Sequence, residues 1–217
     1  TNKGGMIKRL GKYWIKEDSL TKHPIAIYGN QTFALVLAQI YGVELIAPDD
    51  TLIARLENEW TKRHVELKQI GQIAENNFPV FIKPVIPKIF TAGIFESIVD
   101  FRETIKGLTS NEEVLMSSIV DPIEAEARAF VLNGVIRDIA LYEGFAELIA
   151  GRNFLMEFIN SYKDQLPKAV VVDLAFNKLT GWFILEFNAC WGAGLNNCKA
   201  EAVIDCIIEA TIDKRIK

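Results

Sequence analysis

Three side chains that carry hard oxygen donors lie close together in the last quarter of the chain. Asp173 ends a run of three valines, and Glu186 and Asn188 follow a run of four apolar residues as Glu-Phe-Asn. Side chains two residues apart on a strand point to the same face, so Glu186 and Asn188 present two oxygens together. If residues 177–181 form a hairpin turn, Asp173 comes alongside them. Two carboxylates and one amide oxygen suit Mg²⁺, and we expect these three residues to be its ligands.

Each carboxylate also has a simpler interpretation, as a group that hydrogen-bonds a turn at the end of a strand. Burying a carboxylate beside such apolar strands is costly unless a partner compensates its charge. Cations that could be partners occur on other predicted segments: Lys83 ends Phe-Ile-Lys-Pro, Lys88 follows in a loop, and Arg128 shares a strand face with Glu126. Taken alone, Lys83 could be an edge residue with its ammonium in water, and Arg128 could form a cross-strand ion pair.

Together these residues meet the needs of a bound nucleoside triphosphate, which requires cations for its phosphates, a bridging metal ion and an apolar slot for the base. Other common chemistries lack their motifs. The chain contains no G-x-x-x-x-G-K-[ST], no G-x-G-x-x-G, no H-E-x-x-H, no C-x-x-C and no G-x-S-x-G. His23 and His64 are the two histidines, so zinc hydrolysis and histidine-based acid–base catalysis are poorly supplied.

The composition is that of a folded globular protein of 217 residues. Half of the residues are apolar, 24% are charged and the net charge is −4, which argues against disorder and against a nucleic-acid partner. The uncharged stretch over residues 23–43 is interrupted by a proline and two glycines, so we expect no membrane partner. Cys190, Cys198 and Cys206 lack metal-ligand spacing and predict reduced thiols in a cytoplasmic protein. The five residues before Met6 suggest a cloning remnant or the stub of a longer chain.

The first third of the chain predicts a small α/β unit, which we assign to residues 1–76 and which is too small to be a complete domain. Its pattern predicts strands over residues 25–28 and 43–47, a buried helix over 31–41 and a second, capped helix over 51–70. Gly42 ends the first helix.

Residues 77–217 predict an α+β domain with antiparallel hairpins. Strands are expected at residues 78–84, 114–120, 124–132, 135–142, 169–176 and 182–188, and helices at 151–162 and 197–212. Asn133-Gly134 is a strong hairpin-turn signal between two of these strands.

Five segments of this second region occur in a distinctive order. They are Phe-Ile-Lys-Pro, Val-Leu-Met-Ser-Ser-Ile-Val, Glu-Ala-Arg-Ala-Phe-Val-Leu-Asn-Gly, Val-Val-Asp and Ile-Leu-Glu-Phe-Asn. Their order and spacing resemble the ATP-grasp superfamily, and most closely its clade in bacteria and phages that is often labelled a domain of unknown function. The match covers about residues 78–217, and residues 24–75 weakly resemble the preceding pre-ATP-grasp unit. The resemblance implies a nucleotide gripped between two α+β subdomains.

The resemblance also implies roles for the nucleotide-binding residues. Lys83 would contact the α and β phosphates, and Lys88 would act from the loop beside the phosphates. Glu126, or alternatively Glu124, would bind the ribose hydroxyls. The adenine edge would be read by the backbone of a four-residue hinge, Ser117, Ser118, Ile119 and Val120.

The reaction implied by the resemblance is ATP-dependent ligation. Arg128, with Lys88, would stabilise the transferred phosphoryl group, while Asp173, Glu186 and Asn188 would hold Mg²⁺. A carboxylate of a small molecule or peptide would be activated as an acyl phosphate and passed to an amine. The alternatives are a phosphotransferase that releases the phosphorylated molecule and a catalytically silent nucleotide-binding module. Arg63 and Arg152 could serve substrate carboxylates or could be surface residues.

Overall fold

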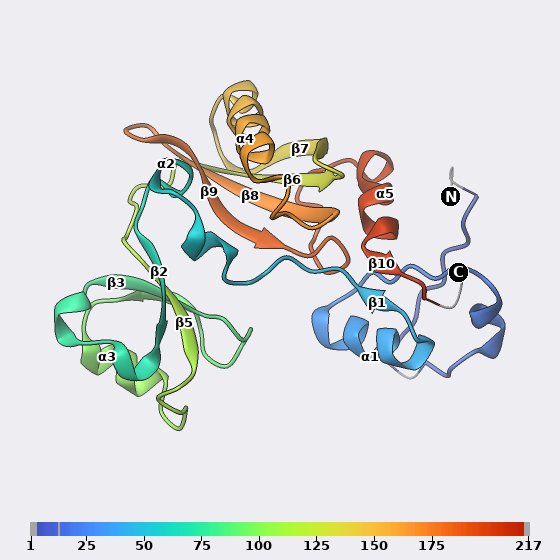
Figure 1. The fold of residues 1–217 in the computed structure, drawn as a ribbon, viewed down its shortest axis with the longest axis horizontal. Helices are drawn as coiled ribbons and strands as arrows, with labels where there is room; N and C mark the ends of the chain where they lie inside the picture. Colours follow the sequence, from blue (N-terminus) through green and yellow to red (C-terminus); the bar gives the residue numbers. More distant parts are fainter. Residues whose placement is uncertain (1–3, 13, 215–217) are drawn as a thin grey trace.

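The computed structural model in Figure 1 describes residues 4–12 and 14–214, so Thr1 to Lys3 of the segment before Met6 lie outside the described residues. Two four-stranded antiparallel sheets form most of the molecule, and a two-stranded sheet lies at one end. Helices cover the two larger sheets, which confirms the expected α+β fold. Over the described residues, no helix combines the length and apolar character that a membrane crossing requires.

The first sheet consists of short strands covered by one helix. The strands are β2 (Val65–Gln69), β3 (Val80–Pro84), β4 (Gly93–Phe95) and β5 (Glu113–Ser117), in the order β2-β5-β3-β4, and the helix is α3 (Ile98–Thr104). Side chains alternate along β3: Val80 and Ile82 pack with Phe101 of α3, whereas Phe81 and Lys83 are half-buried on the opposite face. Lys83 therefore projects from a central strand, away from the core of this sheet.

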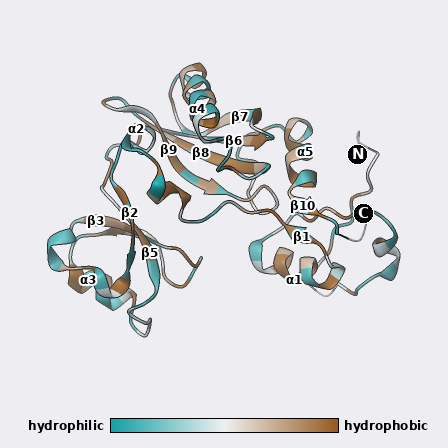
Figure 2. Ribbon diagram, in the orientation of Figure 1, coloured by the Kyte–Doolittle hydropathy of each residue, from teal (hydrophilic) through white to brown (hydrophobic). Residues whose placement is uncertain are grey.

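The second sheet is longer and more deeply buried. Its strands are β6 (Ala125–Leu132), β7 (Val135–Gly144), β8 (Ala169–Asn177) and β9 (Gly181–Asn188), in the order β7-β6-β8-β9, with helices α4 (Leu148–Tyr162) and α5 (Ala200–Glu209). These central strands are largely hydrophobic in Figure 2. The predicted turn at Asn133-Gly134 is confirmed, since both residues have positive φ, at 51° and 73°.

The two faces of the second sheet have separate cores. Val170, Val172 and Leu174 pack with Phe158 and other residues of α4 on one face. Val171, on the opposite face, belongs to a core that includes residues of α5. Alternation along β8 therefore assigns Asp173 to the face that α4 does not cover.

The N-terminal unit is attached to the second sheet. It contains η1 (Asp18–Lys22), α1 (Gln31–Tyr41) and β1 (Glu44–Leu45), which pairs with β10 (Thr211–Ile212). Helix α1 begins where the Asn30 side chain accepts a hydrogen bond from Phe33 N and ends at Gly42, whose φ is 66°. Leu37 and Tyr41 share a core with α5. Residues 25–28 form no strand, and the strand expected over 43–47 is reduced to β1.

The helix expected over residues 51–70 is wrong. This segment forms η2 (Leu52–Arg55), α2 (Asn58–Thr61) and β2, followed by η3 (Ile70–Gln72) and η4 (Glu75–Asn77). Strand β2 pairs with β5 from Val65↔Ser117 to Gln69↔Glu113, and this pairing with a distant segment overrides the local helical spacing. The first sheet thus includes residues that precede the boundary expected between 76 and 77.

Candidate active site

A cleft of about 1220 Å³ separates the two large sheets. The first sheet contributes Lys83 and the loop after β3, and the second contributes Glu126, Glu186 and Asn188. Residues of the segment between β1 and β2 also line this cleft, and Figure 1 shows that segment passing alongside β9 before it enters β2. The topology therefore brings residues from distant parts of the sequence to one cavity.

Arg128 and Asp173 form a buried ion pair within the second sheet. The two residues face each other in register on β6 and β8. Arg128 Nε lies 2.8 Å from Asp173 Oδ1, and Nη2 lies 2.6 Å from Oδ2. The side chains are 11% and 1% exposed, and Arg128 Nη1 also donates to the carbonyl of Gly194. The pair is held rigidly because every terminal nitrogen of the guanidinium has a fixed partner.

Lys83 bridges the two sheets. Its Nζ lies 2.5 Å from Glu186 Oε2, with side chains 39% and 36% exposed. Asn188 Nδ2 donates to Glu186 Oε1 and to Asp173 Oδ2, at 3.0 Å each. The structure therefore brings the three expected metal ligands and two of the expected cations into one hydrogen-bonded cluster.

Glu126 and Glu124 have different surroundings, although they are two residues apart. Glu126 lines the cleft and accepts a hydrogen bond from Tyr142, whose ring lies 5.8 Å from the Arg128 guanidinium carbon. Burial and this bond raise the pKa of Tyr142, so its hydroxyl stays protonated. Glu124 accepts instead from Lys178 N, in the turn between β8 and β9. The geometry favours Glu126 over Glu124 as the residue facing a ligand.

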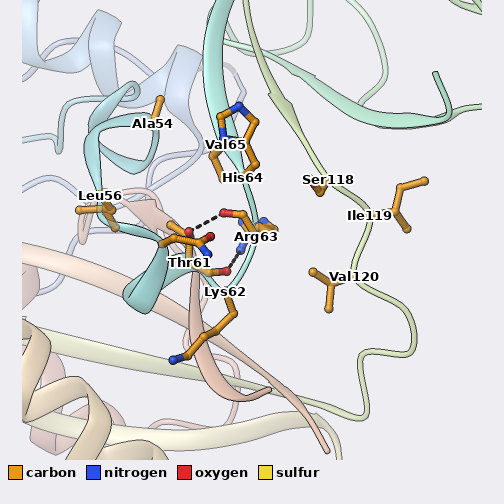
Figure 3. Close-up of a pocket in the computed structure, with 11 residues that line it drawn as sticks. Ala54, Leu56, Thr61, Lys62, Arg63, His64, Val65, Ser118, Ile119 and Val120 are labelled. Carbon is orange, nitrogen blue, oxygen red and sulfur yellow. Dashed lines mark hydrogen bonds between the residues drawn. The ribbon is translucent and has the colours of Figure 1, made fainter. Parts of the chain in front are cut away.

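The remaining expected nucleotide-binding residues also line the cleft. Lys88 is exposed in the loop after β3, where its φ is 69°. Ser117 ends β5, and the segment over residues 118–120 leads from there toward the second sheet. Figure 3 shows Ser118, Ile119 and Val120 across from residues 61–65, around an adjoining hollow of about 570 Å³.

The carboxylates of the cluster have opposite pKa shifts. Burial raises the pKa of Asp173 above its usual value, against the opposing effect of Arg128. Burial also disfavours the charged form of Glu186, but the Lys83 ammonium and the Asn188 amide outweigh it, so the pKa of Glu186 is lowered. Glu186 is thus ionised at neutral pH and faces the cleft as an anion.

The donor chemistry of this cluster fits Mg²⁺. Glu186 and Asn188 line the cleft, whereas Asp173 lies beneath them and is engaged by Arg128. No three Asp, Glu, His or Cys side chains gather at metal-binding distance in the part of the chain that the structure describes, because the third expected ligand is an amide. A hard cation with few protein ligands suits such a set, since Mg²⁺ retains water or phosphate oxygens.

Two arginines considered as substrate ligands have different positions. Arg152 is exposed on α4, and Arg63 lines the cleft. Arg63 is committed to backbone carbonyls of β9, with Nη1 2.9 Å from Ile184 O and Nη2 3.0 Å from Leu185 O. Burial lowers the pKa of Arg63 to about 10, so it remains charged at neutral pH. No local pattern identified Tyr142 or the anchoring of Arg63, because both depend on contacts between segments distant in the chain.

Two α+β subdomains around a cleft that carries lysine, arginine, carboxylates and an asparagine define the ATP-grasp fold. Over residues 60–206 the chain matches the model of an ATP-grasp domain family, the second family of its clade. It belongs to this family.

Solved structures share the fold at low sequence identity. The D-alanine–D-alanine ligase from Bacillus anthracis, complexed with ATP, has a TM-score of 0.51 and 16% identity, over 74% of this chain and 62% of that chain. The RimK domain ATP-grasp protein from Sphaerobacter thermophilus has a TM-score of 0.51 and 12% identity, over 88% of this chain and 68% of that chain. This chain therefore spans less than two thirds of the length of the ligase. A search of curated proteins finds no match.

Proposed function

We propose that the protein is an ATP-dependent ligase that activates a carboxylate as an acyl phosphate and transfers the acyl group to an amine. The observation that carries this proposal is the cluster of Lys83, Glu186 and Asn188 at the cleft, directly above the Arg128–Asp173 pair. It combines cations and hard oxygen donors in one place, as phosphoryl transfer requires. Membership of the ATP-grasp family supports the same chemistry.

The nucleotide would lie between the sheets. Lys83 and Lys88 would neutralise its phosphates, and Glu126 would accept hydrogen bonds from the ribose. Because Ser118 N already donates to His64 O, the adenine edge would be read by the backbone of Ile119 and Val120. These assignments place the sugar and phosphates against the second sheet and the base at the connection between the sheets.

The chemical steps require positioning and charge neutralisation. A substrate carboxylate oxygen attacks the γ-phosphorus of ATP, and the bond to the β–γ bridging oxygen breaks to release ADP. The amine then attacks the acyl carbon, loses a proton, and expels inorganic phosphate. Mg²⁺ held by Glu186 and Asn188, with Asp173, would neutralise phosphate charge when bound. The task of Arg128 is to stabilise the transferred phosphoryl group from its fixed position in the sheet.

A substrate screen tests this function. The protein is incubated with Mg-ATP and pools of amino acids and peptides, and ADP, phosphate and new amides are measured. Formation of ADP and phosphate that depends on both a carboxylate and an amine supports a ligase acting on small molecules or peptides. A phosphorylated product formed without an amine would show a phosphotransferase instead. ATP binding with no turnover across the screen would show a silent nucleotide-binding module.

A further inference from the structure

Strand β9 is irregular immediately before the residues that face the cleft. Asp173 on β8 pairs with Glu186, but the next residue of β8, Leu174, pairs with Ile184. Leu185 is therefore an extra residue, which forms a β-bulge in the edge strand of the second sheet.

This bulge reverses which side chains point to the cleft. Before it, Trp182 and Ile184 pack into the core beneath α4. A regular strand would continue this alternation and direct Glu186 and Asn188 into the same core. After the bulge, Phe187 occupies the α4 side, where its ring stacks 5.9 Å from that of Phe158. Glu186 and Asn188 consequently face the cleft.

Arg63 bonds to both carbonyls at the bulge. One terminal nitrogen of its guanidinium donates to Ile184 O and the other to Leu185 O, on the side of β9 opposite β8, its neighbour in the sheet. The guanidinium carbon also lies 5.3 Å from the ring centre of Phe183. The guanidinium is fixed from its own side as well: Nη1 donates to Thr61 O, and Thr61 Oγ1 donates to Arg63 O, the two bonds drawn in Figure 3.

We propose that Arg63 is a positioning residue that holds the Leu185 bulge and thereby keeps Glu186 and Asn188 turned toward the metal–nucleotide site. This inference rests on the proposed metal role of Glu186 and Asn188. A planar fork of two N–H donors matches two successive carbonyls, which a lysine ammonium cannot bridge in the same way. Arg63 also connects the segment entering the first sheet to the edge of the second, so one side chain links the two sheets beside the cleft.

Calorimetric titration tests this role without requiring turnover. Wild type and Arg63→Met are titrated with ATP in the presence of Mg²⁺ and, separately, with ATP in EDTA. We expect Arg63→Met to weaken binding of Mg-ATP by about tenfold, as is typical when a group that orients a metal ligand is lost, while binding of metal-free ATP changes little. Arg102→Met removes an exposed arginine of α3 and should change neither affinity.

A second variant guards against loss of folding. Arg63→Lys keeps the charge and loses the fork, so it should show a smaller loss confined to Mg-ATP. In Arg63→Ala, added methylguanidinium should restore part of the Mg²⁺-dependent affinity. Equal weakening of Mg-ATP and metal-free ATP would overturn the proposal, as would a crystal structure of Arg63→Met with the bulge retained. If the substrate screen shows no ligation while Arg63→Met still loses Mg²⁺-dependent affinity, the ligase fails and this inference stands.

Discussion

The first and second sheets contribute charge to the cleft in different ways. In the second sheet, Arg128 and Asp173 are neighbours in register on adjacent strands, and two parallel hydrogen bonds hold them out of water. Lys83 of the first sheet crosses the cleft to Glu186 with a single contact, and both side chains are more than one third exposed. The comparison indicates a rigid charged floor and a cation that can exchange its carboxylate for a phosphate.

The largest expected effect comes from breaking the buried pair. Arg128→Met leaves the Asp173 carboxylate buried without its cation, so we expect the free energy of unfolding to fall by about 3–5 kcal/mol. Urea denaturation measures the change. Arg137→Met, which removes the exposed pair with Asp205, is the matched control and should cost less than about 1 kcal/mol. Adding Asp173→Leu to Arg128→Met should recover much of the stability without activity, and a single variant as stable as the control would contradict a rigid floor.

Removing the cleft-facing oxygens should affect turnover much more than folding. We expect Glu186→Ala combined with Asn188→Ala to lower Mg²⁺-dependent ATP turnover by at least about 100-fold, since charge stabilisation of the phosphates is lost. Circular dichroism should show an intact fold. Glu157→Ala with Asn160→Ala, both exposed on α4, is the control pair. Unchanged turnover in the first double variant would refute the metal assignment.

The exchangeable cation should affect nucleotide affinity. In Lys83→Ala the phosphates lose one positive charge, and we expect the dissociation constant of Mg-ATP to rise by about tenfold, equivalent to ~1.4 kcal/mol. Calorimetry measures it against Lys106→Ala, which removes an exposed lysine after α3. Equal affinities in the two variants would remove Lys83 from the phosphate site.

The smallest expected effect is the pH dependence of the Lys83–Glu186 contact. Because the pKa of Glu186 is lowered in the folded protein, the contact stabilises the fold above the pKa of an unfolded glutamate and is lost as pH falls through the folded pKa. With both side chains partly exposed, the contribution should be less than about 1 kcal/mol. The melting-temperature gap between wild type and Glu186→Gln should therefore shrink from pH 7 to pH 3. A constant gap would show that the contact does not titrate.

Local patterns predicted the second sheet well. The strands β6 to β9, the Asn133-Gly134 turn and helix α4 all follow from alternation, turn residues and helical spacing in nearby sequence. The helix predicted over residues 51–70 failed because strand pairing with β5 decides its last part. Helix α3 and strand β4 have too few residues to give a clear periodic signal, and neither was predicted.

The sequence by itself determined which residues could form the site and that Glu186 and Asn188 share a strand face, because a two-residue period is a local property of extended backbone. It did not determine which face. The bulge at Leu185, the anchoring of Arg63 and the approach of Lys83 from another sheet made that choice, since each depends on contacts between segments that lie far apart in the chain.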